Sequence, residues 1–445
     1  MATKSKPIVA IVGRPNVGKS TFFNRIVGRQ ISIVEDTPGV TRDRIYAEAE
    51  WLGRRFTLVD TGGIEMESED LIKRQMRTQA QLAAETADLI LFFVDGRDGM
   101  TSEDQDVADY LRRINKPVLL VVNKVDNAMR EDAMFEFYEL GIGEPLPISS
   151  VHGMGTGDLL DAVIQTIDAE EEPDDNEGTI RIAVVGKPNA GKSSLVNRIL
   201  GEDRTIVSDV PGTTRDAIDS GFTHEGRPYV IIDTAGLRRK ARIEQESLER
   251  FSVIRALSAV RRCDVALLMI DAEAGVSDQD AKIAGYVQES GKPAVILVNK
   301  WDAIDKDDTT VGRYVNELKT QLVFMQYAPI QFISCKTGQR LNKVMELVDE
   351  VHANSQRRIP TGLLNDVIGD ALAANEPPAF SGRRLRIYYS TQTGISPPEF
   401  TLFANNGDLM KDSYRRYLDN HLRKTFDFTG TPLKIICRSR QEKSQ

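Results

Sequence analysis

Short apolar runs recur along the chain, and each is followed by a polar or glycine-containing segment. These runs of four to six residues lie at 8–12, 56–59, 89–94, 118–122, 180–185, 229–232, 265–270 and 294–298. Such runs predict strands that are buried on both faces of a sheet. Stretches with helical character separate them. This alternation predicts an α/β fold, with a mostly parallel sheet that helices cover on both faces.

Two of the predicted helices begin directly after glycine-rich loops. They span Ser20 to Val27 and Ser193 to Leu200, and a glycine follows each of them, Gly28 or Gly201. Glycine is common just past the last turn of a helix, so we expect both helices to end there.

The chain contains a long internal repeat. The sequence Gly-Arg-Pro-Asn-Val-Gly-Lys-Ser at 13–20 returns as Gly-Lys-Pro-Asn-Ala-Gly-Lys-Ser at 186–193, an offset of 173 residues. Later motifs repeat at offsets of 176 and 185 residues. A period of this length is too long for a solenoid, and it indicates a duplicated domain with small loop insertions.

Composition and charge divide the chain further. We predict a first α/β domain over 1–167, an acidic linker over 168–178, a second α/β domain over 179–356 and a basic module over 357–445. The last segment holds 14 Lys and Arg against 9 Asp and Glu, although the whole 445-residue chain has a net charge of −9. The basic module therefore differs in kind from the two α/β domains.

The remaining composition indicates a soluble protein of the cytoplasm. No apolar run approaches the roughly 20 residues that span a bilayer, and no secretory leader is expected. The three cysteines, Cys263, Cys335 and Cys437, are far apart, which suits a reducing compartment and predicts no metal cluster. The four histidines have no ligand or triad spacing.

The repeated octapeptides predict phosphate-binding loops. Their glycines let the backbone curl around a phosphate chain, and the following helix adds its N-terminal dipole. The lysine would reach the β- and γ-phosphates and the serine would ligate Mg²⁺. The two loops consist of Gly13, Arg14, Pro15, Asn16, Val17, Gly18, Lys19 and Ser20, and of Gly186, Lys187, Pro188, Asn189, Ala190, Gly191, Lys192 and Ser193.

A second pair of motifs follows the strands that end near residues 60 and 232. Its aspartate would hold Mg²⁺ through water, and its last glycine would donate its N–H to the γ-phosphate. The tetrapeptide alone is weak evidence, but it lies at the same distance from both phosphate loops. With the residue after each, the candidates are Asp60, Thr61, Gly62, Gly63 and Ile64, and Asp233, Thr234, Ala235, Gly236 and Leu237.

A third pair of motifs predicts that the base is guanine. A carboxylate can accept both the N1–H and the 2-amino group of guanine, whereas adenine would leave it unpaired. The candidates are Asn123, Lys124, Val125 and Asp126, and Asn299, Lys300, Trp301 and Asp302. Ser149 and Ser334 follow a later strand, where backbone N–H groups could meet guanine O6.

Together these motifs resemble those of translation-factor-class GTPases, and the whole chain resembles the bacterial EngA/Der family of double GTPases. Further matches are Pro-Gly-Val-Thr-Arg-Asp at 38–43, Pro-Gly-Thr-Thr-Arg-Asp at 211–216 and Gly-Ile-Ser-Pro-Pro at 394–398. The resemblance implies two tandem P-loop GTPase domains and a C-terminal α+β KH-like domain. It also implies GTP or GDP with Mg²⁺, and a role with the large ribosomal subunit and its rRNA. We expect a monomer without a membrane span, and we expect no DNA partner.

The hydrolytic residues depart from the Ras-like pattern. Ras-like enzymes use a Gln after Asp-x-x-Gly to orient water, and here Ile64 and Leu237 cannot do so. Related GTPases with Asn at the positions of Asn16 and Asn189 bind K⁺, which predicts a K⁺ that lowers the barrier. The alternative is that these asparagines only form a turn.

Two further segments point to a nucleotide-dependent switch. Thr41 and Thr214 would ligate Mg²⁺ only in the GTP state, so the loops that follow them would be released after hydrolysis. The cationic run from Arg238 to Arg242 is either a solvated loop or a nucleotide-dependent contact with RNA or an acidic domain.

The basic module offers two interpretations. Its clusters Arg383, Arg384, Arg386, Arg415, Arg416, Arg423 and Lys424 suit RNA phosphates. It lacks the Gly-x-x-Gly loop of KH domains, so it would contact rRNA by charge or dock on the GTPase domains.

The sequence leaves two alternatives to a ribosomal switch GTPase. An RNA-binding assembly chaperone with structural nucleotide sites is the first. A GTPase for tRNA modification is the second, but that would require additional domains.

Overall fold

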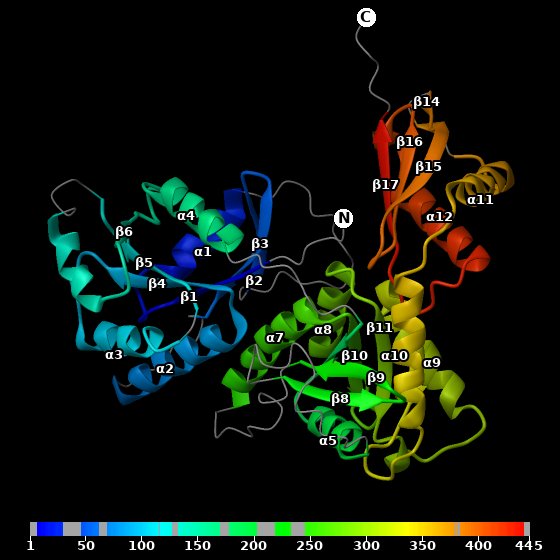
Figure 1. The fold of residues 1–445 in the computed structure, drawn as a ribbon, viewed down its shortest axis with the longest axis horizontal. Helices are drawn as coiled ribbons and strands as arrows, with labels where there is room; N and C mark the ends of the chain where they lie inside the picture. Colours follow the sequence, from blue (N-terminus) through cyan, green and yellow to red (C-terminus); the bar gives the residue numbers. More distant parts are fainter. Residues whose placement is uncertain are drawn as a thin grey trace, which may run out of the picture. The chain divides into compact units, whose positions relative to one another are not determined.

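The computed structural model describes residues 7–29, 46–61, 69–114, 116–126, 132–169, 178–202, 219–232, 245–377, 379–380 and 383–439. These residues form two compact units. One contains the first predicted domain together with residues 242–258, and the other contains the rest of the second domain together with the basic module (Figure 1). Among the described residues, no helix is both long and apolar enough to cross a membrane.

The first unit is built on a six-stranded sheet. Its strand order is β2 (Tyr46–Trp51), β3 (Arg54–Asp60), β1 (Ile8–Val12), β4 (Leu89–Asp95), β5 (Val118–Asn123) and β6 (Leu146–Pro147). All neighbours are parallel except β2, which runs antiparallel to β3. The prediction of a mostly parallel sheet is therefore confirmed.

Helices cover both faces of this sheet because the central strands are buried on both sides. Alternate residues of β1 enter two different cores, with Ile8 and Val12 on one face and Val9 and Ile11 on the other. The helices are α1 (Lys19–Arg29), α2 (Glu69–Thr86), α3 (Ser102–Leu111) and α4 (Thr156–Ala169), with a 3₁₀ segment η2 at Asp132–Leu140. In Figure 1, α2 and α3 lie on one face, and α1 and α4 lie on the other.

The second sheet has the same strand order. It reads β8 (Ser220–His224), β9 (Arg227–Ile231), β7 (Ile180–Val185), β10 (Val265–Asp271), β11 (Ala294–Asn299) and β12 (Ile330–Phe332), with only β8 antiparallel. Its helices are α5 (Lys192–Glu202), α8 (Asp278–Glu289), α9 (Thr310–Gln321) and α10 (Asn342–Ser355), with short 3₁₀ segments η3 (Trp301–Ala303) and η4 (Val323–Met325). Helix α7 (Gln245–Arg262) is divided between the units, and its residues up to Ser258 belong with the first domain. The repeated motifs thus belong to duplicated folds.

Two local predictions were incomplete or wrong. Helices α1 and α5 continue through Gly28 and Gly201, since packing of their apolar faces outweighs the roughly 1 kcal/mol cost of an internal glycine. Strands β2 and β8 were not predicted. They are partly exposed edge strands without an apolar run, so periodicity gave no signal for them.

The basic module folds as a separate α+β layer. It consists of α11 (Thr361–Ala374), β13 (Ala379–Phe380), β14 (Arg383–Arg384), β15 (Ile387–Gly394), β16 (Glu399–Ala404), η5 (Gly407–Leu409), α12 (Asp412–Thr425) and β17 (Lys434–Ser439). Strand β16 pairs antiparallel with β15 and parallel with β17. Leu364, Phe400, Leu418 and Leu422 form its fully buried centre.

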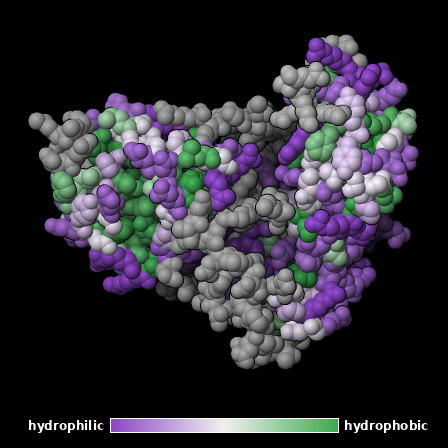
Figure 2. Space-filling view, turned by 45° about the horizontal axis from the view of Figure 1, so that its top comes forward, coloured by the Kyte–Doolittle hydropathy of each residue, from purple (hydrophilic) through white to green (hydrophobic). Residues whose placement is uncertain are grey.

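In Figure 2, hydrophilic (purple) and apolar (green) residues are interspersed on the face of the molecule that is shown.

The basic module packs on the second α/β domain through the loop 428–431. The N–H of Ala294, at the start of β11, donates to Gly430 O at 2.8 Å, and Gly430 N–H donates to Tyr327 O at 2.8 Å. A Cβ on Gly430, whose φ is +75°, would lie 2.1 Å from Val351 Cγ2. Only glycine fits this approach. Of the two interpretations of the module, docking on an α/β domain is seen at this loop, and the RNA contact stays a prediction.

Candidate functional site

The two phosphate loops have nearly the same conformation. Each connects the first strand of its sheet with the following helix, and Asn16 and Asn189 have left-handed backbones with φ of 63° and 65°. Lys19 Nζ donates to the carbonyls of Gly13 at 2.8 Å and Arg14 at 2.6 Å. Lys192 Nζ makes the equivalent bonds, both at 2.7 Å. The loops therefore curl around their own lysine, and the predicted phosphate contacts stay a prediction.

Packing also requires the loop glycines. A Cβ at Gly18 would lie 2.2 Å from Asn123 Nδ2, and one at Gly191 would lie 2.1 Å from Asn299 Nδ2. At Gly13 a Cβ would lie 2.3 Å from the carbonyl oxygen of Phe93 in β4. Of the intervening loop residues, Val17 and Ala190 are buried, and Pro15 and Pro188 are half-buried.

The two loop lysines have unusual protonation behaviour. Burial lowers the pKa of Lys19 and of Lys192 to about 8, from an ordinary value of 10.5. For Lys19 the nearby Asp60 opposes this effect. A bound polyphosphate would favour the charged ammonium and raise the pKa again. Each lysine is therefore suited to an anionic ligand that enters the loop.

Two of the three predicted Mg²⁺ ligands of the first repeat, Ser20 and Asp60, lie together, and the third, Thr41, is outside the described residues. Ser20 Oγ donates to Asp60 Oδ2 at 2.7 Å, and Thr61 Oγ1 donates to Ile11 O at 2.5 Å. A hydroxyl and a carboxylate at the mouth of a phosphate loop are hard oxygen ligands, which fit Mg²⁺ shared with phosphates. Within the described residues, no cluster of three or more His, Cys, Asp or Glu could hold a metal by itself.

Several predicted residues lie outside the part of the chain that the structure describes. They are Thr41, Gly62, Gly63, Ile64, Thr214, Asp233, Thr234, Ala235, Gly236 and Leu237, together with the cationic run 238–242 and residues 170–177 of the linker. Ser193 is described at the start of α5.

Asn123 and Asn299 join three parts of each site. Asn123 Nδ2 donates to Val17 O at 2.7 Å, and its Oδ1 accepts from Ser150 N–H at 2.9 Å. Asn299 makes the same two bonds, to Ala190 O at 2.9 Å and from Cys335 N–H at 3.0 Å. Each amide thus holds the phosphate loop against the loop that follows the next strand. Sequence reasoning placed these residues at the base but did not foresee this connection.

Aspartates at the ends of β4 and β10 hold the lysines of the third motif. Lys124 Nζ pairs with Asp95 at 2.5 Å, and Lys300 Nζ pairs with Asp271 at 2.5 Å. Both lysines have left-handed backbones. Sequence reasoning missed the two aspartates, although each ends a buried apolar strand. The residue after each lysine packs inward. Val125 is buried, and the centroid of the Trp301 ring lies 4.2 Å from that of Phe332.

The predicted guanine-reading carboxylates accept a hydrogen bond from the predicted serines. Ser149 Oγ donates to Asp126 Oδ1 at 2.9 Å, and Ser334 Oγ donates to Asp302 Oδ1 at 2.6 Å. The Ser334 hydroxyl, more than any other group, lowers the pKa of Asp302. Because the carboxylate is charged at neutral pH, it can accept two hydrogen bonds from a purine edge.

A further pair of aspartates forms ion pairs with cationic residues of the two phosphate loops. Arg14 Nε lies 3.6 Å from Asp104 Oδ2, and Lys187 Nζ lies 3.4 Å from Asp280 Oδ2. Both aspartates are fully buried in capping boxes at the starts of α3 and α8. Arg14 therefore connects the first phosphate loop to α3, and Lys187 connects the second phosphate loop to α8. The Thr/Ser-x-x-Asp spacing at 101–104 and 277–280 could have predicted these caps.

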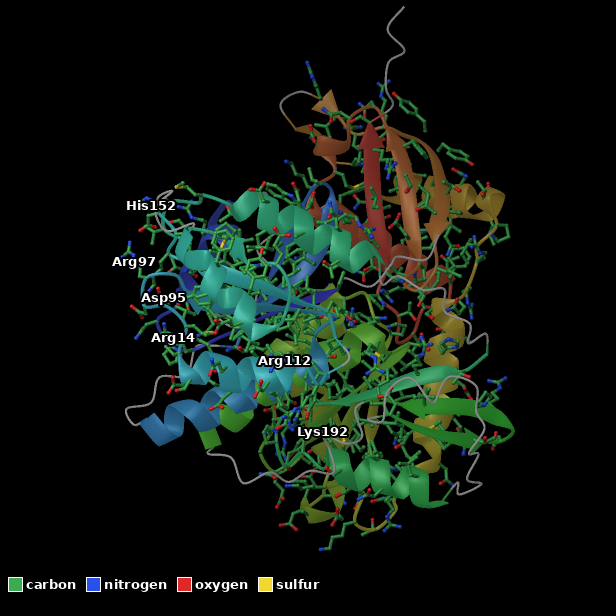
Figure 3. All side chains as sticks on the ribbon, turned by 60° about the vertical axis from the view of Figure 1, so that its left-hand side comes forward. Arg14, Asp95, Arg97, Arg112, His152 and Lys192 are labelled. Atoms are coloured by element: carbon green, nitrogen blue, oxygen red, sulfur yellow. The ribbon has the colours of Figure 1, made fainter. Side chains whose placement is uncertain are left out.

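In each repeat the lysine lies in the loop after β1 or β7, and the predicted guanine-reading aspartate lies just after β5 or β11. The asparagine that ends β5 or β11 connects the two regions, because its side chain donates to the phosphate loop. Figure 3 labels Arg14, Asp95 and Arg97 at one edge of the first domain, and Lys192 in the second. This geometry suits a ligand with phosphates at one end and a base with two adjacent donors at the other.

Comparison with known proteins agrees with this geometry. A family model described as "50S ribosome-binding GTPase" matches residues 8–124 and 181–300, and one described as "KH-domain-like of EngA bacterial GTPase enzymes, C-terminal" matches 358–438. GTPase Der of Alkaliphilus oremlandii is 56% identical over 98% of this chain and 99% of its own. GTPase Der of Clostridium perfringens is 54% identical over 98% of this chain and 100% of its own. A solved structure of Aquifex aeolicus Era with GDP and AlF₄⁻ is 24% identical, covers 56% of this chain and 87% of its own, and has a TM-score of 0.31.

Proposed function

The chain belongs to the GTPase Der (EngA) family, and we propose that its two nucleotide sites switch its binding to the large ribosomal subunit during assembly. The protein is a GTPase that binds GTP and GDP with Mg²⁺. The observation that carries the proposal is the duplicated site, in which a lysine bonded to the carbonyls of its own loop and a serine-supported aspartate recur at matching positions. Two matched sites in a chain that also carries a KH-like domain suit a ribosomal particle as partner.

We assign the residues as follows. Lys19 and Lys192 bind the β- and γ-phosphates, and Asp126 and Asp302 accept from guanine. Ser20, Asp60 and Thr41, with Ser193, Asp233 and Thr214, would hold Mg²⁺, which supplies charge neutralisation at the phosphates. The domain bounds 1–167, 179–356 and 357–445 belong to the same proposal.

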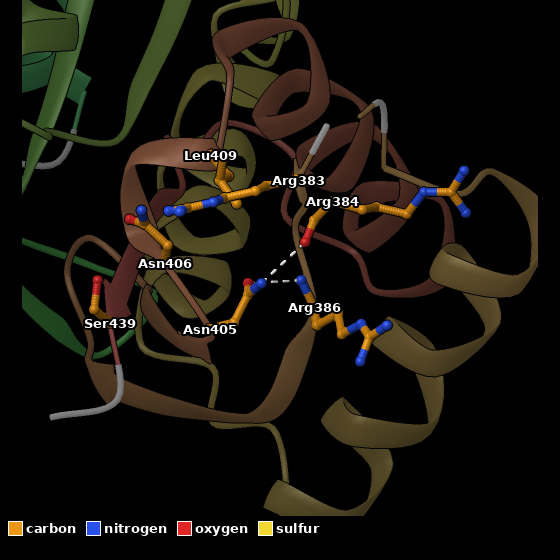
Figure 4. A pocket seen from close by; sticks show the side chains of 7 residues that line it. All are labelled: Arg383, Arg384, Arg386, Asn405, Asn406, Leu409 and Ser439. Carbon is orange, nitrogen blue, oxygen red and sulfur yellow. Dashed lines mark hydrogen bonds between the residues drawn. The ribbon is translucent and has the colours of Figure 1, made fainter. Parts of the chain in front are cut away.

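The RNA contact would use the exposed arginines of the KH-like domain. Arg383, Arg384 and Arg386 line a hollow of about 650 Å³ with Asn405, Asn406, Leu409 and Ser439 (Figure 4). Asn405 holds its rim, because its side chain accepts from Arg386 N–H and donates to Arg384 O, both at 2.9 Å. Arg423 is not available for RNA, since it pairs with Asp419 and donates to Phe428 O and Thr431 O.

Cosedimentation with large ribosomal subunits tests the proposal. We expect the full-length protein to bind the subunits more tightly with a non-hydrolysable GTP analogue than with GDP, because only a γ-phosphate would hold both switch loops. Variants Lys19→Ala and Lys192→Ala would each lose part of this nucleotide dependence. Binding and subunit maturation that persist unchanged in the double variant would instead support an RNA chaperone with structural nucleotide sites.

Potassium is the second part of the proposal. Asn16 and Asn189 are exposed in their loops, so their amides are available to a cation beside the phosphates. Left-handed backbone by itself favours asparagine, so this role needs a separate test. We expect GTP turnover in K⁺ buffer to exceed that in Na⁺ buffer of equal ionic strength by about tenfold or more, and Asn16→Ala with Asn189→Ala to remove the difference. Equal rates in both buffers would exclude the K⁺ role.

A further inference from the structure

The two repeats differ in charge at one position beside the guanine-reading carboxylate. The second residue after the aspartate that ends β4 is Arg97, and the matching residue after β10 is Glu273. The backbone is the same at both places. Arg97 N–H donates to Asp95 Oδ1 at 2.9 Å, and Glu273 N–H donates to Asp271 Oδ1 at 3.0 Å. The side chains of opposite charge therefore start from equivalent points.

In the first repeat this side chain reaches the guanine-reading carboxylate. The Arg97 guanidinium donates to Asp126 Oδ2, while Ser149 Oγ donates to Oδ1. Both oxygens of Asp126 therefore have a partner in the protein. The Arg97 side chain is 52% exposed and that of Asp126 is 20% exposed, so the contact lies at the open edge of the site.

In the second repeat the corresponding side chain turns to a different partner. Glu273 Oε2 lies 3.7 Å from Lys300 Nζ, the lysine that also pairs with Asp271. Among the described residues, none forms an ion pair with Asp302, and Lys336 and Lys306 influence it only from a distance. Within the part of the chain that the structure describes, Ser334 Oγ and the backbone N–H of Asp302 itself are the donors to this carboxylate.

These contacts bear on base binding. Guanine presents N1–H and the 2-amino group side by side, and a carboxylate receives them with its two oxygens. In the first repeat, one of those oxygens already accepts from a cation that guanine would have to displace or share. We propose that Arg97 competes with guanine for Asp126 and weakens nucleotide binding at the first site, whereas Glu273 leaves the second site without such a competitor. This inference rests on the proposed function of Asp126.

The expected size of the competition is modest. An ion pair at an exposed edge is weak and is screened by salt. Its removal should tighten binding by about two- to fivefold at low ionic strength. The difference should shrink at high ionic strength, which a purely structural role of Arg97 would not predict.

Titration with a fluorescent GDP analogue tests the inference in the full-length chain. The parent is Lys192→Ala, so that binding reports the first site. We expect Arg97→Gln in this parent to bind about two- to fivefold more tightly, with a smaller gain in 0.5 M salt. Arg55→Gln is the matched control, because Arg55 is another exposed arginine of the same domain and is paired with Glu50. It should leave the dissociation constant unchanged.

The reverse exchange is made in the second site, with Lys19→Ala as parent. Glu273→Arg should weaken GDP binding, whereas Glu273→Gln, which loses the Lys300 contact without adding a cation, should not. Unchanged or weaker binding by Arg97→Gln would overturn the inference and leave the proposed function intact. If the Lys192→Ala parent binds no GDP at all while its thermal unfolding is that of the unaltered chain, the guanine assignment of the first site itself is wrong.

Discussion

Replacing Asp126 or Asp302 by asparagine is expected to abolish guanine-nucleotide binding at that site and to create affinity for xanthosine nucleotides. Guanine offers two adjacent donors, and the carboxylate accepts both. An asparagine amide can accept one of these hydrogen bonds with its oxygen. Its own N–H₂ group would then face the 2-amino group of guanine, and two donors repel each other. Xanthine has a carbonyl at that position, so the amide matches it. Loss of charge-assisted bonds worth about 1.5–3 kcal/mol each corresponds to a decrease of about 10²- to 10⁴-fold in affinity.

The measurement is a titration of each single variant with GDP and with xanthosine diphosphate. The unaltered repeat serves as an internal reference, because its GDP binding should persist. Asp305→Asn is the control for loss of a nearby charge, since Asp305 is exposed close to the second site. If both variants keep their preference for GDP, these aspartates do not read the base.

The second large effect concerns the loop lysines. Lys19→Ala or Lys192→Ala should lower nucleotide affinity at that site by about 10²- to 10³-fold, because each ammonium supplies several charge-assisted hydrogen bonds to phosphate. GTP turnover at the altered site should fall at least as much. Lys319→Ala, an exposed lysine on α9, is the control. Thermal unfolding of each variant separates loss of the ligand from loss of the fold. An altered site that still binds and hydrolyses GTP normally would contradict the assignment.

The lowered pKa of these lysines gives an independent readout. In the empty loop each lysine has a pKa of about 8, and bound phosphates raise it. Binding therefore takes up a proton above pH 8, so affinity should be highest below pH 8 and should fall as the pH rises beyond it. Calorimetry at pH 9, in buffers with different ionisation enthalpies, measures the proton uptake. The lysine variants should lack this proton uptake. An affinity that does not change between pH 7 and pH 9.5 would exclude this mechanism.

Some features of the molecule followed from local pattern alone. The apolar runs predicted every central strand, since a strand buried on both faces requires an unbroken apolar segment. The edge strands β2 and β8 gave no such signal, because half of their surface faces solvent. Likewise, Gly28 and Gly201 looked like helix ends, but packing extended both helices beyond them.

For the site, the sequence by itself determined the chemical groups: two curled phosphate loops with their lysines, and two carboxylates suited to guanine. These depend on residue type and short spacing, which set backbone conformation directly. Only the tertiary structure decided which distant groups meet: Asn123 with the phosphate loop, Arg14 with buried Asp104, and Arg97 with Asp126. Those encounters depend on the order and register of parallel strands, which bring to one edge of the sheet residues that lie about 30 to 110 positions apart and leave no mark in local spacing.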